Sequence, residues 1–279
     1  MRIALSIFIL MLASSSPAIA DEANDIEPCK YMFVETGMPY HRGDTGEKGQ
    51  SLICRQGYIL SHNNEKRVPD WVFQILPNTQ FSSEVERTEK FEPDPDLAQE
   101  NRALLKDYKY SGFDRGHQAP AEDFSSNLDM MNESFYLSNM APQVGVGFNQ
   151  HIWAHLEEQV RKWLDTRTRL IVITGPVYDA PDLSEPEIRA IPKPKRGLAE
   201  EETGRVTVPA AFYKIVYDPE NGRVIAFLMP NMKLSKRKPA EFLTSVADIE
   251  ERTGIDFFRK LTKRRQRVLE SNVSPMWEH

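Results

Sequence analysis

The sequence is poor in cysteine and has no long hydrophobic segment. Its only two cysteines, Cys29 and Cys54, lack the Cys-x-x-Cys spacing, which argues against a thiolate zinc site. No apolar run approaches the roughly 20 residues that a membrane-spanning helix needs, so we expect a soluble mature chain. The sequence also contains no Gly/Ser-rich linker, internal repeat or low-complexity tract. We therefore expect a single domain over residues 21–279.

The N-terminal segment has the pattern of an export signal. Arg2 precedes a short apolar run, and Ala18-Ile-Ala20 is a small-x-small cleavage pattern. We therefore predict a signal peptide over residues 1–20, cleaved after Ala20, and a secreted or periplasmic protein that makes no membrane contact after cleavage. In an oxidising compartment Cys29 and Cys54 would pair, although two buried free thiols are an alternative.

The charge balance does not by itself indicate a nucleic-acid-binding protein. The formal net charge is −6, whereas affinity for nucleic acid comes largely from cations that contact phosphates. Basic residues do cluster at 189–196, 233–238 and 259–267. Such runs are more often solvated faces than binding sites, so composition alone leaves the partner open.

The most informative stretch is Asp114-Arg-Gly-His117. A neutral imidazole can take a proton from water near pH 7. A guanidinium group matches phosphate oxygens in pairs, and glycine lets the backbone approach a ligand closely. These residue types together suit phosphodiester hydrolysis. A structural ion pair between Asp114 and Arg115 remains an alternative for those two side chains.

A predicted helix over residues 149–164 carries the next candidates. Apolar residues recur at every fourth position along it, which is typical of an amphipathic helix. Asn149, at its start, is either a helix N-cap or a ligand for a hard cation such as Mg²⁺. Glu157 lies a little over two turns later and can face the same side. His151 and His155 have zinc-site spacing but no evident third ligand, so we interpret them as residues of the helix surface.

The order of these motifs resembles the DNA/RNA non-specific endonucleases, a family with a ββα-metal (His-Me finger) site. The Asp-Arg-Gly-His block is followed by Leu137-Ser-Asn139, by Pro142-Gln143 and by Gly147-Phe-Asn-Gln-His-Ile-Trp153. Matching features extend from about Cys54 to Leu261, so the resemblance covers most of the chain. It implies cleavage of both DNA and RNA with Mg²⁺, or Mn²⁺ in its place, as cofactor.

The resemblance also implies roles for individual residues. His117 is expected to be the general base, and Asn149 the metal ligand. Glu157 would hold waters of the metal, and Arg115 and Arg87 would stabilise charge on the phosphate. The match of Arg87 is the weakest of these because it depends on loop spacing. For substrate binding the expected residues are Asp114, Asn139 and Gln143, with loop hydrogen bonding as the alternative for the two amides.

The pattern of elements predicts an α+β fold with a mixed, largely antiparallel sheet that carries the ββα-metal motif. Strands are expected at 57–60, 70–76, 135–138, 169–174, 206–217 and 223–228, and helices at 98–105, 149–164, 240–251 and 255–262. The leading functional hypothesis is a Mg²⁺-dependent non-specific endonuclease. The alternatives are a catalytically inactive nucleic-acid- or inhibitor-binding protein of the same fold, and a phosphodiesterase that acts on small esters.

Overall fold

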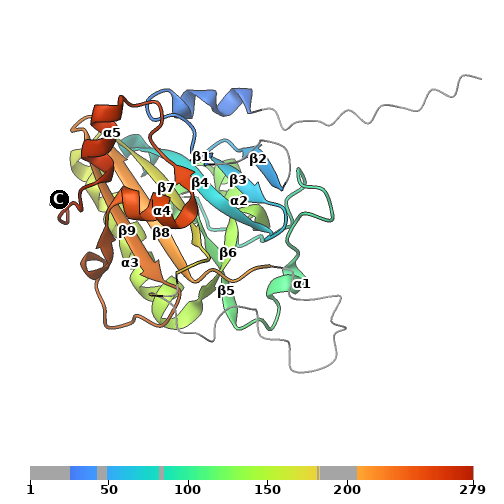
Figure 1. The fold of residues 1–279 in the computed structure, drawn as a ribbon. Coiled ribbons are helices and arrows are strands. Elements are labelled where there is room, and N and C mark those ends of the chain that lie inside the picture. The colour runs from blue at the N-terminus through green and yellow to red at the C-terminus, as the bar shows by residue number, and fades with distance from the viewer. Residues whose placement is uncertain (1–25, 43–48, 82–84, 181, 183–205, 279) are drawn as a thin grey trace, which may run out of the picture.

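The computed structural model describes residues 26–42, 49–81, 85–180, 182 and 206–278 (Figure 1). The predicted signal peptide at 1–20 and the basic run at 189–196 lie outside these residues. Within the described part of the chain, no helix is long and apolar enough to cross a membrane.

The centre of the described structure is an antiparallel sheet of seven strands in the order β10-β9-β8-β7-β4-β3-β2. Two small two-stranded sheets accompany it, β1 with β11 and β5 with β6. The strands are β1 (Tyr40–His41), β2 (Gln50–Cys54), β3 (Tyr58–Asn63), β4 (Val68–Pro77), β5 (Phe113–His117), β6 (Met140–Val144), β7 (Arg169–Val177), β8 (Ala211–Asp218), β9 (Arg223–Pro230), β10 (Leu243–Thr244) and β11 (Ile255–Asp256). The predicted largely antiparallel α+β architecture is confirmed.

Both faces of the large sheet are covered, which explains why its central strands are almost uniformly apolar. Along β7, Leu170 and Val172 belong to one hydrophobic core, whereas Ile171 and Ile173 belong to the core on the opposite face. Successive side chains of a strand point to opposite faces, so one continuous apolar run supplies both cores. A third cluster packs around Phe124 and Phe135, beneath the β5–β6 hairpin.

Different helices cover the two faces. α3 (Ala154–Trp163) packs on one face through Leu156, Val160 and Trp163. The other face is covered by the 3-10 helix Glu27–Phe33, α4 (Val246–Thr253) and α5 (Lys263–Glu270). Figure 1 shows α4 lying across the sheet and α5 at one end of the molecule. Two shorter helices are α1 (Leu105–Tyr108), which precedes β5, and α2 (Leu128–Ser134), which lies between β5 and β6 in the sequence.

Four predicted elements differ from the structure. The helix expected at 240–251 begins only at Val246, because the 3-10 helix Pro239–Phe242 and β10 come before it. The strand expected at 135–138 is instead a 3-10 turn, Leu137–Asn139, and the strand that pairs with the motif is β6. The helix expected at 255–262 is wrong, because Ile255 begins β11 and the next helix is α5. The helix expected at 98–105 begins only at Leu105. Tertiary packing of apolar side chains determines these segments, whereas local pattern does not.

The N-terminal segment is joined to the sheet by a disulfide between Cys29 and Cys54. The predicted pairing of the two cysteines is therefore confirmed. Cys29 is buried in the core that α4 and α5 cover, whereas Cys54 ends β2. The bridge closes a loop with a sequence separation of 25 residues, which is worth roughly 3 kcal/mol in the chain-entropy model.

Candidate active site

The β5–β6 hairpin and the start of the following helix border a cleft of about 1040 Å³. After β6 the chain passes through the segment Gly145–Trp153 into α3. This segment is kinked at Gly147, whose φ of 97° favours glycine, and is π-helical after the kink. This strand–strand–helix order is the one that the motif predicted. The cleft is lined mainly by charged and aromatic side chains, among them Arg87, Phe91, Asp114, Arg115, His117, Asn149, Glu157 and Arg161.

His117 ends β5 and lines the cleft. Its ring packs edge-on against Phe135 at 5.0 Å and lies 5.7 Å from the ring of Phe91. Its Nε2 is buried and has no hydrogen-bond partner among the described residues. Burial, reinforced by the positive charges of Arg87 and Arg115, lowers the pKa of His117 to about 3. The imidazole is therefore neutral at pH 7 and can accept a proton.

The packing around position 116 explains why the motif has a glycine there. Gly116 lies opposite Ala141 in the hairpin, and a Cβ built on it would approach Gln143 Oε1 to 2.1 Å. Any side chain at position 116 would therefore displace Gln143. Glycine here keeps the hairpin closed beside His117, with no positive φ involved.

Asp114 and Asn149 form the most direct link between the hairpin and the helix. Asn149 Nδ2 donates to Asp114 Oδ2 at 2.9 Å, and Gln150 Nε2 donates to the same oxygen at 2.8 Å. These bonds hold the Asn149 amide nitrogen toward the hairpin. Asn149 is not a side-chain N-cap, because its amide bonds to Asp114 and it lies within the π-helical segment. Asp114 therefore orients Asn149 and, among the described residues, forms no ion pair with Arg115.

The two predicted arginines flank His117. The Arg115 guanidinium lies over the Phe91 ring, 3.9 Å from its centroid, and makes no ion pair among the described residues. Arg87 lies over the Phe135 ring at 5.1 Å and pairs with Glu122. Both line the cleft, and both lower the pKa of His117. Arg115 keeps its hydrogen-bonding donors available to a ligand.

A group of charged side chains underlies α3. Glu157 lines the cleft, and its Oε1 is buried without a hydrogen-bond partner among the described residues. Burial raises its pKa, and the positive charge of Lys214 opposes that rise. Lys214 is only 1% exposed and donates to Thr174 Oγ1 at 2.8 Å. Arg161 Nη1 contacts Asp123 Oδ1 at 2.9 Å, so two cations and two carboxylates share this region.

Asn139 and Gln143 are buried and are not among the residues that line the cleft, so their expected role in substrate binding stays a prediction. Asn139 is fully buried; it donates to Ala119 O and Ser134 O and accepts from Ala119 N. Gln143 is also fully buried and packs against Gly116. These amides face the interior because the 3-10 turn and β6 direct them beneath the hairpin.

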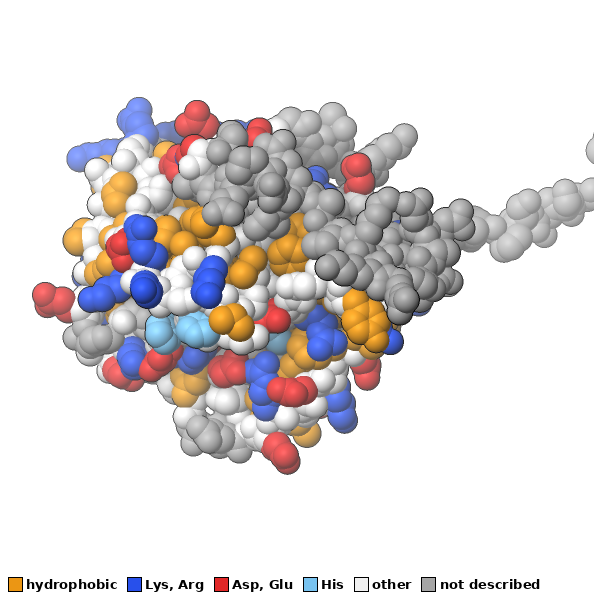
Figure 2. All heavy atoms as spheres, turned by 90° about the horizontal axis from the view of Figure 1, so that it is seen from below, with side chains coloured by type: hydrophobic (Ala, Val, Ile, Leu, Met, Phe, Trp, Pro, Cys, Tyr) orange, Lys and Arg blue, Asp and Glu red, His pale blue; other side chains and the backbone are white. Residues whose placement is uncertain are grey.

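Two residues of the site, Arg161 and Lys214, were not found from the sequence. Arg161 lies four residues after Glu157, so helical spacing could have indicated it. No local sequence pattern indicates Lys214, which lies in β8, 57 residues after Glu157. On the face shown in Figure 2, histidine side chains lie among both cationic and acidic side chains, so the region is not uniformly basic.

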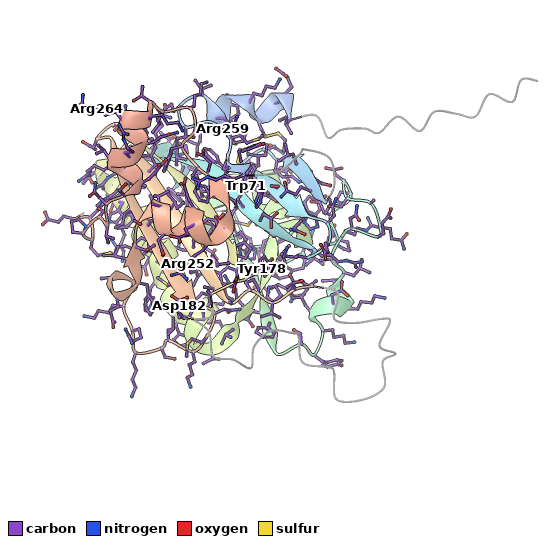
Figure 3. The ribbon with its side chains drawn as sticks, in the orientation of Figure 1. Trp71, Tyr178, Asp182, Arg252, Arg259 and Arg264 are labelled. Atoms are coloured by element: carbon purple, nitrogen blue, oxygen red, sulfur yellow. A yellow bond between two sulfur atoms is a disulfide. The ribbon has the colours of Figure 1, made fainter. Side chains whose placement is uncertain are left out.

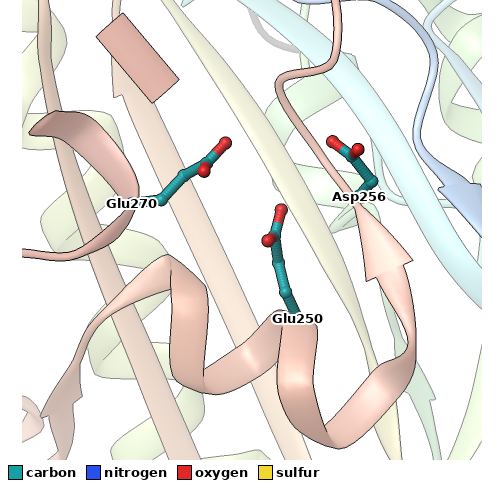
Figure 4. A group of neighbouring side chains, drawn as sticks. All are labelled: Glu250, Asp256 and Glu270. Atoms are coloured by element: carbon teal, nitrogen blue, oxygen red, sulfur yellow. The ribbon is translucent and has the colours of Figure 1, made fainter. Parts of the chain in front are cut away.

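A second carboxylate group lies on the other side of the sheet. The carboxyl groups of Glu250, Asp256 and Glu270 point toward one another (Figure 4). Glu250 accepts from Arg42 and from the backbone N–H of Phe257. Burial and the two neighbouring carboxylates raise the pKa of Glu270 to about 7. None of these three residues lines the cleft, so the cluster belongs to the packing of α4 and α5.

Comparison with known proteins identifies the class of this fold and site. The family model for DNA/RNA non-specific endonucleases matches residues 39–264, so the chain belongs to that family, whose members are hydrolases that act on nucleic acid. Nuclease C1 of Cunninghamella echinulata var. echinulata is 35% identical over 233 residues, covering 78% of this chain and 86% of its own. A mitochondrial nuclease of Saccharomyces cerevisiae is 32% identical over 242 residues, with 80% and 70% covered.

The fold has a matching solved relative. A chain in a crystal structure of the EndoG/EndoGI complex has a TM-score of 0.66 and 29% identity, covering 77% of this chain and 88% of that one. The predicted ββα-metal nuclease fold is thereby confirmed.

The comparison corrects one prediction, the secreted or periplasmic location. Relatives from Schizosaccharomyces pombe, Saccharomyces cerevisiae and Danio rerio are named mitochondrial nucleases, which points away from that location. One arginine, a short apolar run and an Ala-x-Ala pattern were together too little to decide the destination of the chain.

Proposed function

We propose that this nuclease is a Mg²⁺-dependent, sugar-non-specific endonuclease in which His117 is the general base. The observation that carries the proposal is the position of His117 in the cleft, which Arg87, Arg115 and Asn149 also line. Burial and the two arginines lower the pKa of His117, which keeps its imidazole neutral. His117 would accept a proton from water as the water oxygen attacks phosphorus. The bond from phosphorus to the leaving 3′ oxygen breaks in that step, and that oxygen is protonated from solvent.

The cationic side chains of the cleft support substrate binding through the phosphate backbone. Arg115 and Arg87 flank His117, and both guanidinium groups suit phosphate oxygens. Contacts to phosphate carry little information about base or sugar. A cleft that binds in this way would accept both DNA and RNA.

The donors present fit a hard cation. Asp114 fixes the Asn149 amide nitrogen, which leaves Asn149 Oδ1 as the ligand oxygen. Glu157 adds a carboxylate whose Oε1 accepts no hydrogen bond from the part of the chain that the structure describes. Neutral amide and carboxylate oxygens suit Mg²⁺, or Mn²⁺ in its place, as an ion that keeps several waters. When bound, the ion would stabilise negative charge on the phosphoryl group and the leaving oxygen.

We also propose that residues 21–279 form one nuclease domain. The support is the single seven-stranded sheet, which runs from β2 near the start of the described chain to β10 near its end. Limited proteolysis should leave one protected core that contains both strands. Separate stable fragments would contradict this.

The test is degradation of supercoiled plasmid and total RNA, with Mg²⁺ or with EDTA, by the parent and by His117→Ala. We expect the parent to degrade both in Mg²⁺ and neither in EDTA, and His117→Ala to lose at least about 100-fold in rate. An unchanged melting temperature would show that the variant is folded. Full activity of His117→Ala would contradict its role as the base.

This assay, together with measurements of DNA binding and of bis-p-nitrophenyl phosphate turnover, separates the alternatives that the sequence left open. Folded parent protein that binds DNA but cleaves nothing would be an inactive binding protein. Cleavage of bis-p-nitrophenyl phosphate without cleavage of plasmid or RNA would indicate an enzyme for small esters. Degradation of only one polymer would narrow the substrate and keep the proposed mechanism.

A further inference from the structure

The C-terminal region carries a cationic surface that the cleft does not use. Between Phe258 and Val268 the sequence has six basic residues and no acidic one. Five of them form what we call the α5 surface: Arg259, Lys260, Lys263, Arg264 and Arg267. All five are exposed, whereas Gln266 and Leu269 of the same helix are buried. Figure 3 shows Arg259 and Arg264 at the end of the molecule where α5 lies.

Within the described part of the chain the five cations are not paired with acidic side chains; the carboxylate of Glu270 acts on Lys263 only through its charge. Among the described residues, no ion pair includes any side chain of the α5 surface. The sixth cation of the run, Arg265, donates to Tyr217 OH at 3.1 Å and is not counted with them. Arg252, by contrast, pairs with Asp182 and Asp248. Arg252 and Asp182 are labelled in Figure 3.

The positions of these positive charges destabilise α5 when no anion is bound to it. Lys263 and Arg264 occupy the first turn of α5, which has no acidic residue, and the positive end of the helix dipole lies there. Arg267 lies one turn from both, so like charges are neighbours along the helix. Each effect destabilises the helix slightly. A bound polyanion would remove both penalties at once.

The surface lies apart from the cleft. α5 packs through Leu269 on one face of the large sheet, whereas α3 packs through Leu156 on the opposite face. The α5 surface therefore does not extend the cleft that His117 lines, and it can act on the polymer independently.

We propose that the α5 surface is a second, non-catalytic binding site for the phosphate backbone of nucleic acid, which holds the nuclease on long substrates. The role of this site in holding long substrates rests on the proposed function, but binding of nucleic acid to the α5 surface does not require catalysis. An anionic membrane is the less favoured occupant. A surface-lying helix needs a free apolar face, and α5 exposes only Val268 while Leu269 is buried in the core.

The experiment measures binding of a labelled DNA duplex of about 40 base pairs to His117→Ala protein, with and without the added changes Arg264→Gln and Arg267→Gln. We expect the dissociation constant at low salt to rise about 5- to 20-fold, and the slope of log affinity against log salt to fall by about 2. The matched control replaces Lys30 and Arg237, which pair with Glu27 and Glu241, and should change affinity by less than about twofold.

An unchanged affinity and salt slope in the α5 variant would overturn the proposal, as would an equal loss in the control. Loss of binding to phosphatidylglycerol vesicles together with unchanged DNA binding would assign the surface to a membrane instead. Bis-p-nitrophenyl phosphate turnover by protein with His117 intact should be equal with and without the α5 changes. Parent protein that binds through α5 but cleaves nothing would refute the proposed function and leave this surface standing.

Discussion

Asp114 Oδ2 accepts a 2.9 Å hydrogen bond from Asn149 Nδ2, and this contact joins the β5–β6 hairpin to the helical segment across 35 residues of sequence. It also decides which end of the amide is free. With its nitrogen bound to Asp114, Asn149 has its oxygen left for another ligand. Asp114, which we expected from the sequence to bind substrate, thus positions the side chain of Asn149.

The first prediction concerns this contact. Asp114→Asn removes the charged acceptor, so the Asn149 amide is no longer fixed. We expect the Mg²⁺ concentration for half-maximal cleavage to rise about 10- to 100-fold, the usual effect of losing a group that orients a metal ligand. Titration of plasmid cleavage with Mg²⁺ measures this. Asp129→Asn, an exposed change of the same charge, should leave the titration unaltered. An unshifted titration for Asp114→Asn would refute the orienting role.

The second prediction concerns pH. Burial and the charges of Arg87 and Arg115 lower the pKa of His117, and the base works only when deprotonated. The acid limb of kcat/KM should therefore lie below the ordinary histidine pKa of about 6.5. Arg115→Gln removes one of the positive charges, so the limb should move to higher pH while the rate falls. A pH–rate profile of both proteins measures the shift. A lower rate with an unmoved limb would mean that Arg115 acts on the phosphate alone.

The third prediction separates Asn139 from catalysis. Its amide makes three hydrogen bonds to backbone groups in the interior. Asn139→Ala would leave those groups unsatisfied, so we expect the free energy of unfolding to fall by about 2–4 kcal/mol. Urea denaturation measures that loss. At a temperature where the variant is folded, cleavage should stay within about threefold of the parent. A large loss of activity at unchanged stability would support the role in substrate binding.

The fourth prediction uses the second carboxylate cluster. The pKa of Glu270 is raised to about 7 in the folded protein. Folding stability therefore begins to fall as the pH rises above the ordinary pKa of about 4.5, and the whole loss is reached above pH 7. Glu270→Gln should therefore raise the melting temperature by about 2–3 °C at pH 8 and have little effect near pH 4. Glu251→Gln, an exposed change on α4, is the control. Equal effects of Glu270→Gln at both pH values would contradict the assignment.

Much of the site could be predicted from short stretches of sequence. Asp114 to His117 are contiguous, and Glu157 follows Asn149 at helical spacing, so local chemistry and one helix period bring these residues into a single cleft. The disulfide was also predictable, because two cysteines allow only one intramolecular pairing. The sheet was indicated by apolar runs such as the one in β7, which need both faces covered.

Other features depended on contacts between distant segments. Ile255, Phe257 and Phe258 resembled a helix, but their burial in the core that α4 and α5 cover requires an irregular segment after β11. Asn139 and Gln143 face inward because of how the hairpin packs. Lys214 enters the region of Glu157 only because β8 lies beneath α3. The sequence by itself therefore determined the chemical groups and the family of this nuclease, since these reside in local patterns. Only the tertiary structure decided which groups line the cleft and which charges α5 leaves unpaired, because burial and pairing are set by residues far apart in the chain.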